Sequence, residues 1–361
     1  MLLKYKIKPI SPVITPFMSD TFFGHFCWAL AFHKGESFLT DFLDLYEDEK
    51  IAPVLFSSAF PAGFLPRPVL PPLSRKKAQE FIDKEMIKDL DKKAETNLKG
   101  SGQIKGGSQK KDKKELLFDA RSLMKKWNKV KFISLAHWNE IKDNYSESAL
   151  ISIFNRENSK NSDFLNDKNA PVSEVSASNV INRLTGAVDA SGGLFVREKQ
   201  WYPENAALDI YVEVNLPQFE SDVEWFMTKF LPDNGFGADK NIGMGVLEIL
   251  RDSEFDESSI TANAPNAKVA LSLTAFEGME KYSAFYRLKT KFGRLGGTYA
   301  VSSPTGGNPR PFKKPILMYE PGALFFTQES LNRTMLLKGV HTDERIRHCG
   351  VPVTVGINLS V

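Results

Sequence analysis

The chain has 361 residues, of which 42% are hydrophobic and 25% charged, so it is expected to fold as one large or two ordinary domains rather than remain disordered. A formal net charge of +3 is too small to indicate nucleic-acid binding alone, so the placement of the charges matters more. Cys27 and Cys349 are too far apart in sequence for a metal-binding motif, and no signal peptide or membrane span of ~20 apolar residues is apparent, which favours a reducing cytoplasm and no membrane contact.

The first predicted elements are a strand and a helix. Residues 3–10 alternate apolar and polar side chains, which predicts a strand with one buried face. Ser19 is the predicted N-cap of the following helix, and Asp20 lies in its first turn, where the helix dipole favours an anion. Apolar side chains then recur every three or four residues, which predicts an amphipathic helix with an aromatic face: Phe22, Phe23, Phe26, Cys27 and Leu30.

The middle of the chain has weaker patterns. A strand is predicted over 54–60, an irregular proline-rich segment over 64–73 and a charged helix over 76–98. Residues 100–114 contain mostly Gly, Ser, Gln and Lys, which predicts a mobile loop, and the polar segment 155–169 is interpreted in the same way. A basic cluster begins at the end of the first of these loops and continues beyond it: Lys110, Lys111, Lys113, Lys114, Arg121, Lys125, Lys126, Lys129 and Lys131.

A second organised stretch begins near residue 194. Two strands, 194–197 and 207–214, are predicted to be joined by a turn at 203–205, and a helix over 219–231, a glycine-rich loop over 235–245 and a strand over 246–250 follow. Without the middle segments the order is β-α-β-β-α-β, which is the ferredoxin-like order.

The domain prediction follows from this order. Residues 1–255 form one domain with long insertions at about 65–180, and an acidic linker leads to a strand-rich domain over 262–361. The predicted class is α+β, with two ferredoxin-like (RRM-type) domains.

The glycine-rich loop is the strongest candidate ligand site. Successive N–H groups in glycine turns can form a concave anion site, and a lysine adds positive charge. A phosphodiester fits that description, although an ordinary helix-to-strand connection is the alternative. The loop contains no Gly-Lys-Ser/Thr Walker sequence and follows a helix, which excludes a dinucleotide fingerprint. The candidate residues are Gly235, Gly237, Lys240, Asn241, Gly243 and Gly245.

Three further segments are candidates for contact with a phosphate chain, and each has a structural alternative. The first is a projecting hairpin over 183–195, or else an ordinary surface hairpin. The second is a basic strand face over 286–297, where Arg287, Lys289 and Lys291 alternate, or else a solvated strand face. The third is the start of the first helix, or else plain capping. Their candidate residues are Arg183, Thr185, Gly186 and Gly192; Lys291, Arg294 and Lys313; and Ser19 and Thr21.

Signals for catalysis are weak. His25 and His33 are eight residues apart on the first helix, which is not the spacing of a helical metal pair, and His341 and His348 lie in a charged segment. No nucleophile elbow or carboxylate-rich metal cluster is evident, so no catalytic residue, metal or cofactor is expected.

The segment 19–30, Ser-Asp-Thr-Phe-Phe-Gly-His-Phe-Cys-Trp-Ala-Leu, resembles the first-helix motif of the RAMP proteins of type III CRISPR systems. The match is closest to the 5′-handle-capping subunit of the type III-A (Csm) effector. Landmarks of that family also correspond to segments 129–138, 183–195, 235–245 and 291–297, together with 313–314 and 320–322.

This resemblance implies a non-catalytic subunit that holds the repeat-derived 5′ handle of the crRNA in antiviral defence. It implies contact with the large polymerase/HD-type signalling subunit and with a backbone RAMP subunit, and target RNA nearby. The loop 235–245 would wrap the handle, and the hairpin at 183–193 would act as a thumb. Two alternatives remain: a RAMP endoribonuclease that processes precursor crRNA with His25 as general base, and a nucleotide-binding enzyme.

Overall fold

The structure is a computed structural model that describes residues 1–48, 52–71, 76, 118, 122, 125–158, 170–188, 193–300, 311–327, 331 and 336–360. The lysine-rich loop predicted over 100–114, all but residue 76 of the helix predicted over 76–98, residues 159–169 and Gly192 lie outside the described residues.

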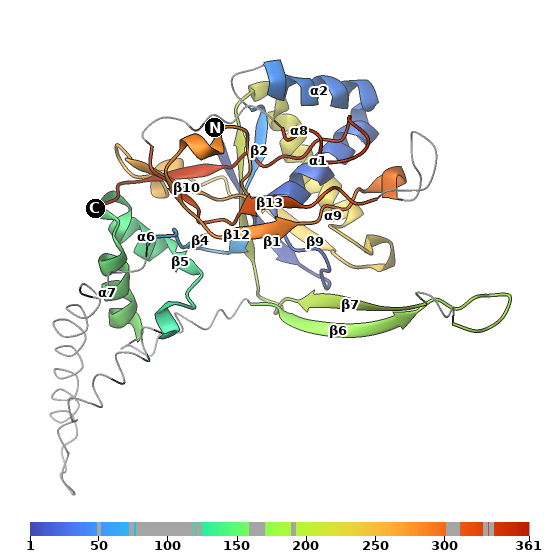
Figure 1. Ribbon diagram of the computed structural model, residues 1–361, viewed down its shortest axis with the longest axis horizontal. Helices are drawn as coiled ribbons and strands as arrows, with labels where there is room; N and C mark the ends of the chain where they lie inside the picture. Colours follow the sequence, from blue (N-terminus) through green and yellow to red (C-terminus); the bar gives the residue numbers. More distant parts are fainter. Residues whose placement is uncertain are drawn as a thin grey trace, which may run out of the picture.

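The first structural unit is built on an antiparallel sheet with helices on one face (Figure 1). Strand β1 (Leu2–Pro9) lies between β8 (Leu208–Val214) and β9 (Leu247–Arg251), and β2 (Val54–Phe56) and the short β3 (Phe60–Pro61) pair with β8. The strand order β2-β8-β1-β9 is that of a ferredoxin-like unit, with β1 central.

Two helical stretches of this unit lie where the sequence predicts them, and a third, over residues 36–48, was not predicted. Helix α1 (Ser19–Lys34) follows β1, and α2 (Glu36–Asp48) packs beside it. A second helical stretch precedes the glycine-rich loop, and it consists of a 3-10 turn, α8 (Glu220–Trp225), a π-helical turn (Phe226–Phe230) and α9 (Leu231–Asn234). The first unit has the order β-α-β-β-α-β, but its second strand is β2 rather than the predicted strand at 194–197.

The predicted pairing of the strands around residues 194–214 is wrong. Strand β7 (Leu194–Trp201) pairs along its whole length with β6 (Val172–Asn179), whereas both edges of β8 are occupied by β1 and β2. The ribbon β6–β7 projects from the body, which confirms the predicted projecting hairpin (Figure 1). A turn between sequence neighbours did not imply pairing, because β8 is the buried central strand of another sheet.

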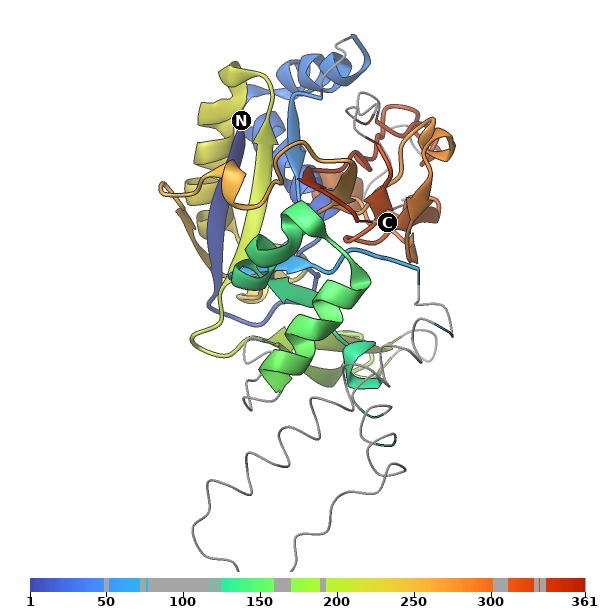
Figure 2. The same ribbon diagram turned by 90° about the vertical axis from the view of Figure 1, so that its left-hand side faces the viewer.

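Part of the predicted insertion belongs to the body. Strand β4 (Phe64–Pro66), within the segment predicted to be irregular, pairs with β5 (Phe132–Ser134), and α6 (Leu135–Ile141) and α7 (Glu147–Asn158) follow. These helices lie near the C-terminus in both views (Figures 1 and 2). Their buried aromatic side chains, Trp138, Tyr145 and Phe154, belong to the main hydrophobic cluster.

The second unit repeats the strand order of the first. Strands β10 (Ala267–Ala270), β11 (Ala284–Phe285), β14 (Leu324–Phe325) and β15 (Thr354–Ile357) form an antiparallel sheet in the order β11-β14-β10-β15. A separate ribbon joins β12 (Leu288–Lys291) to β13 (Ile316–Tyr319). Among the described residues of this unit only short 3-10 turns connect the strands, so its two ferredoxin-like helices stay a prediction.

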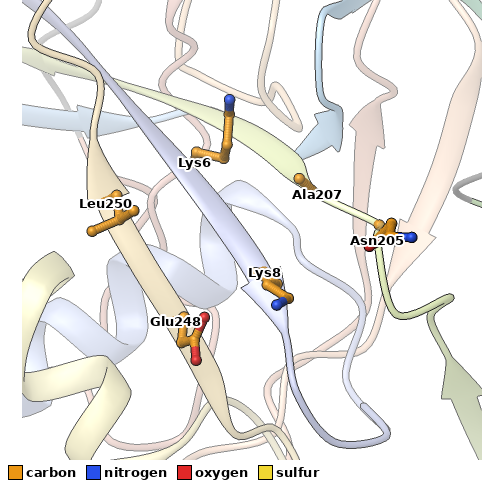
Figure 3. A pocket seen from close by; sticks show the side chains of 7 residues that line it. Lys6, Lys8, Asn205, Ala207, Glu248 and Leu250 are labelled. Atoms are coloured by element: carbon orange, nitrogen blue, oxygen red, sulfur yellow. The ribbon is translucent and has the colours of Figure 1, made fainter.

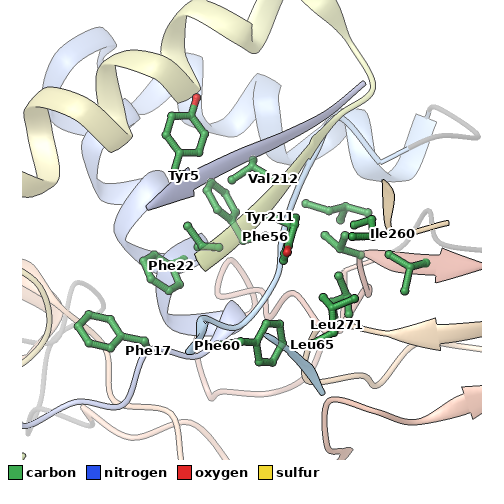
Figure 4. Close-up of a cluster of buried hydrophobic side chains, with 14 of the residues drawn as sticks. Tyr5, Phe17, Phe22, Phe56, Phe60, Leu65, Tyr211, Val212, Ile260 and Leu271 are labelled. Atoms are coloured by element: carbon green, nitrogen blue, oxygen red, sulfur yellow. The ribbon is translucent and has the colours of Figure 1, made fainter. Parts of the chain in front are cut away.

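One hydrophobic cluster spans both units. Tyr5, Phe22 and Phe56 of the first unit, Ile260 within the predicted linker and Leu271 beyond it belong to the same buried set (Figure 4). Hydrogen bonds cross the junction as well, since the Ser58 N–H donates to the Leu271 carbonyl at 2.9 Å. The predicted boundary therefore separates two sheets but not two cores.

Candidate nucleic-acid interface

The glycine-rich loop is tightly packed. Its glycines at 235, 237, 243 and 245 all have positive φ, between 68° and 85°. At Gly245 a Cβ atom would lie 2.0 Å from the Phe236 carbonyl oxygen, and at Gly237 it would lie 2.6 Å from the Thr15 Cβ. Gly243 is different, because nothing lies within 4 Å of its Cβ position. The glycines thus serve chain geometry and close packing.

A buried phenylalanine anchors the loop to the body. The Phe236 ring lies 4.8 Å from the rings of Phe17 and Phe22 and 4.9 Å from that of His25, measured between centroids. Phe236 is fully buried, so the loop is fixed to α1 and to the segment that precedes it.

The N–H groups of the four glycines are all used inside the protein. They donate to the Leu231 carbonyl, to His25 Nε2, to the Lys240 carbonyl and to the Pro12 carbonyl, in the order of the chain, at 2.8–3.1 Å. The glycine pattern predicted an anion nest made of these N–H groups, and that prediction is wrong for them, because they are not available to an external ligand.

The tip of the loop remains open to a ligand. Within the part of the chain that the structure describes, the N–H groups of Asp239, Lys240 and Asn241 make no hydrogen bond to the body of the first unit. Asn241 is exposed and Lys240 half-buried, and burial lowers the pKa of the Lys240 ammonium below its usual value. An ammonium beside the backbone of an exposed turn can bind an oxyanion, so the candidate surface is the tip rather than the glycines.

His25 is half-buried and acts as a hydrogen-bond acceptor. Its Nε2 accepts the Gly237 N–H at 3.0 Å, and burial together with the nearby Lys240 lowers the pKa of the imidazole to about 4. A general base needs a lone pair that can reach a substrate proton. The Nε2 lone pair is occupied, which argues against the alternative role of His25 in RNA cleavage.

The hairpin β6–β7 is attached to the same surface. Arg197 forms an ion pair with Asp239 of the loop at 2.7 Å, and Val13 bridges to Gln200 near the base of the hairpin. Of the predicted contact residues, Arg183, Thr185 and Gly186 lie in the turn at the tip, where neighbouring Leu184 is 97% exposed. The structure thus brings the hairpin and the glycine-rich loop together.

Within the predicted basic strand face of the second unit, Lys291 points inward, contrary to the prediction, whereas Arg287 is exposed and Lys289 half-buried. Lys291 Nζ lies 3.1 Å from Asp20 Oδ1 on α1, and the buried Lys313 Nζ donates to the Arg347 carbonyl at 2.7 Å. Burial lowers the pKa of Lys313. Arg294 stays exposed, beside the Phe312 ring. The opposite face of the β12–β13 ribbon is the exposed one, and it carries Tyr286, Leu288, Phe292 and Leu317.

The helix start is also used internally. Met18, not Ser19, is the N-cap of α1, and no side chain caps it. Ser19 is buried; its hydroxyl accepts the Leu273 N–H at 3.0 Å and thus joins the two units, which corrects its predicted place on the RNA surface. The Thr21 hydroxyl lies 3.5 Å from Lys291 Nζ. The Asp20 carboxylate faces Lys291, so this helix start has an internal counter-ion.

Sequence reasoning missed one basic surface. Lys6 and Lys8 line an open groove on the outer face of the first sheet, together with Asn205, Glu248 and Leu250 (Figure 3). The alternation of lysines with apolar residues in β1 indicated their exposure. The groove could not be predicted, because it depends on the distant segments 205–207 and 248–250.

The described residues hold no cluster of three or more His, Cys, Asp or Glu side chains that could bind a metal. None of their helices is both long enough and apolar enough to span a bilayer.

Comparisons with known proteins place the fold. No family model and no curated protein sequence matches the chain. A solved structure of the Csm1–Csm4 cassette in complex with AMPPNP contains a chain that matches over 100% of both chains, with a TM-score of 0.50 and 12% identity. The cassette in complex with cA4 gives the same coverage and TM-score with 14% identity. The Csm3–Csm4 subcomplex of a type III-A interference complex matches over 99% of both chains, with a TM-score of 0.49 and 16% identity. The chain therefore has the fold of Csm4, which confirms the predicted likeness in fold.

Proposed function

We propose that this chain is a non-catalytic, crRNA-binding subunit of a type III-A CRISPR effector complex. It holds the repeat-derived 5′ handle of the guide RNA and docks the large polymerase-like signalling subunit and a backbone RAMP subunit. The observation that carries the proposal is the agreement in fold with Csm4 over the full length of both chains, despite only 12–14% identity.

The surface of the chain supports this proposal. The tip of the glycine-rich loop presents the exposed Asn241 beside Lys240, and the hairpin is joined to that loop by the Arg197–Asp239 ion pair. Contacts of this kind position a phosphate chain without reading its sequence. The occupied Nε2 of His25 supports a binding role over cleavage.

The test is coexpression of the chain with the large signalling subunit, the backbone subunit and a CRISPR array. The expected result is a complex that contains all three proteins and short RNAs with a common 5′ end. Copurification of the proteins without RNA, or of RNAs with heterogeneous 5′ ends, would contradict the proposal.

Binding to the handle RNA should also depend on salt and on Lys240. The logarithm of the association constant is expected to fall with the logarithm of salt concentration by roughly 0.7 per phosphate contacted. Lys240→Ala should make this slope shallower by about one contact. Lys281→Ala, which removes an exposed lysine of the second unit, is the matched control and should leave the slope unchanged.

A further inference from the structure

Two side chains from outside the glycine-rich loop hold two consecutive N–H groups of the loop. The Gly237 N–H donates to His25 Nε2 at 3.0 Å, and the Ala238 N–H donates to Thr15 Oγ1 at 3.0 Å. His25 belongs to α1 and Thr15 to the connection that precedes it, more than 200 residues earlier in the chain. The two acceptors are therefore positioned by the body of the first unit rather than by the loop.

The chemistry of both acceptors suits this task. His25 Nε2 can accept only when it carries no proton, and burial keeps the imidazole neutral. The ring also packs on Phe236, the residue before Gly237. Thr15 fills the space that a Cβ at position 237 would need, so the same residue supplies an acceptor and a packing contact.

The direction of these two hydrogen bonds determines which groups the loop presents. Consecutive N–H groups in a turn with positive φ often converge on an external anion. Here those of Gly237 and Ala238 point toward the body. Among the described residues, none of the next three, from Asp239 to Asn241, donates to the body of the first unit.

We propose that His25 and Thr15 are positioning residues that turn the N–H groups of Gly237 and Ala238 inward and thereby hold the tip, residues 239–241, in its ligand-binding conformation. The part of this inference that concerns RNA rests on the proposed function. The conformational part does not, because the two hydrogen bonds are present without a ligand.

Paired substitutions separate the acceptor from the shape of each side chain. His25→Gln keeps an acceptor near the position of Nε2, whereas His25→Phe keeps an aromatic ring without the acceptor. Thr15→Ser keeps the hydroxyl, whereas Thr15→Val keeps the volume of the side chain and removes the oxygen. The Thr15 pair provides an independent test if His25→Phe does not fold.

Two readouts are required in the assembled complex. The two hydrogen bonds from Gly237 and Ala238 to His25 and Thr15 are called the clamp. Hydrogen exchange of the segment 235–245 reports on the clamp directly, and loss of one acceptor is expected to speed exchange by about tenfold. Affinity for the repeat-derived 5′ RNA should fall by a similar factor in His25→Phe and Thr15→Val, while His25→Gln and Thr15→Ser stay near wild type.

Each outcome has a distinct meaning. Wild-type exchange and affinity in both His25→Phe and Thr15→Val would overturn the clamp. If these variants exchange faster while the wild-type complex binds no RNA, the clamp would be supported and the proposed function overturned. Site-specific cleavage of precursor RNA that is lost in His25→Gln would make His25 a catalytic residue and overturn its assignment as a positioning residue.

Discussion

At the scale of single residues, the glycine-rich loop shows what a sequence motif does and does not reveal. The pattern of glycines correctly marked backbone with positive φ, but the fate of the N–H groups depends on Thr15 and His25, which are distant in sequence. No local pattern contains that information. The loop was therefore predicted as a site, while the groups it presents were not.

Two glycines of this loop, Gly243 and Gly245, should differ in their tolerance of a methyl group. Gly243→Ala incurs only the strain of a left-handed residue, about 1–2 kcal/mol, because its Cβ would meet open space. Gly245→Ala adds a collision with the Phe236 carbonyl oxygen, so its loss of unfolding free energy should be at least about 3 kcal/mol. Denaturant unfolding of the two variants measures the difference. Equal losses would show that the loop relaxes freely.

His25 should make stability depend on pH. Its pKa is about 4 in the folded chain and near 6.5 when unfolded, so the unfolded state binds more protons between these values. Its stabilising contribution is complete above about pH 6.5 and is lost as the pH falls toward 4. By linkage, the His25 share of the loss between pH 7 and 5 is about 2 kcal/mol.

The matched control for this prediction is His25→Gln, which cannot titrate. Urea unfolding at both pH values should show a smaller loss in the variant than in wild type. Buried His348, whose pKa is also lowered, contributes equally to both proteins and cancels. Identical pH dependence in the two proteins would contradict the neutral state of His25.

At the scale of elements, periodicity predicted β1 and α1 well but could not predict partners. Lys289 and Lys291 alternate along β12, yet Lys291 turns toward α1, where the Asp20 carboxylate provides a counter-ion, while Arg287 stays exposed. The residues of β7 and β8 were each identified as strands, and only their pairing was wrong. Pairing and facing depend on tertiary contacts, which the spacing of residues within one strand does not encode.

The Asp20–Lys291 pair should be a strong link between α1 and β12. Their side chains are only 6% and 15% exposed, so removing one partner leaves a buried charge uncompensated. Asp20→Asn is expected to lower the free energy of unfolding by about 3 kcal/mol. The double variant Asp20→Asn/Lys291→Met should recover part of that loss, since no orphan charge remains at Lys291. A double-mutant cycle with a coupling energy near zero would contradict the link.

At the scale of the whole molecule, the α+β class and the order of the first unit could be predicted, because strong periodicity marks β1, α1 and the helix before the loop. The shared core could not. The acidic composition of 252–265 suggested a linker, but Ile260 within it is fully buried. A few apolar side chains in a polar segment are enough to join two sheets. The average composition of the segment does not reveal these single residues.

The shared core predicts that both units unfold together. Leu271 of the second unit is fully buried in the common cluster, so Leu271→Ala should cost about 2–5 kcal/mol. All the tryptophans lie before residue 255, so tryptophan fluorescence reports on the first unit, whereas hydrogen exchange of β15 reports on the second. Both signals should shift by the same amount. A shift confined to β15 would indicate independent domains.

The ribbon β6–β7 contributes no side chain to any buried cluster of the described residues. The folding of the body therefore does not depend on the side chains that the ribbon carries. Mutations that shorten, lengthen or re-surface it would escape the selection that keeps the interior intact. The sequence of the ribbon is thus free to change together with the partner that the ribbon contacts, while the sequence of the body is constrained by its packing.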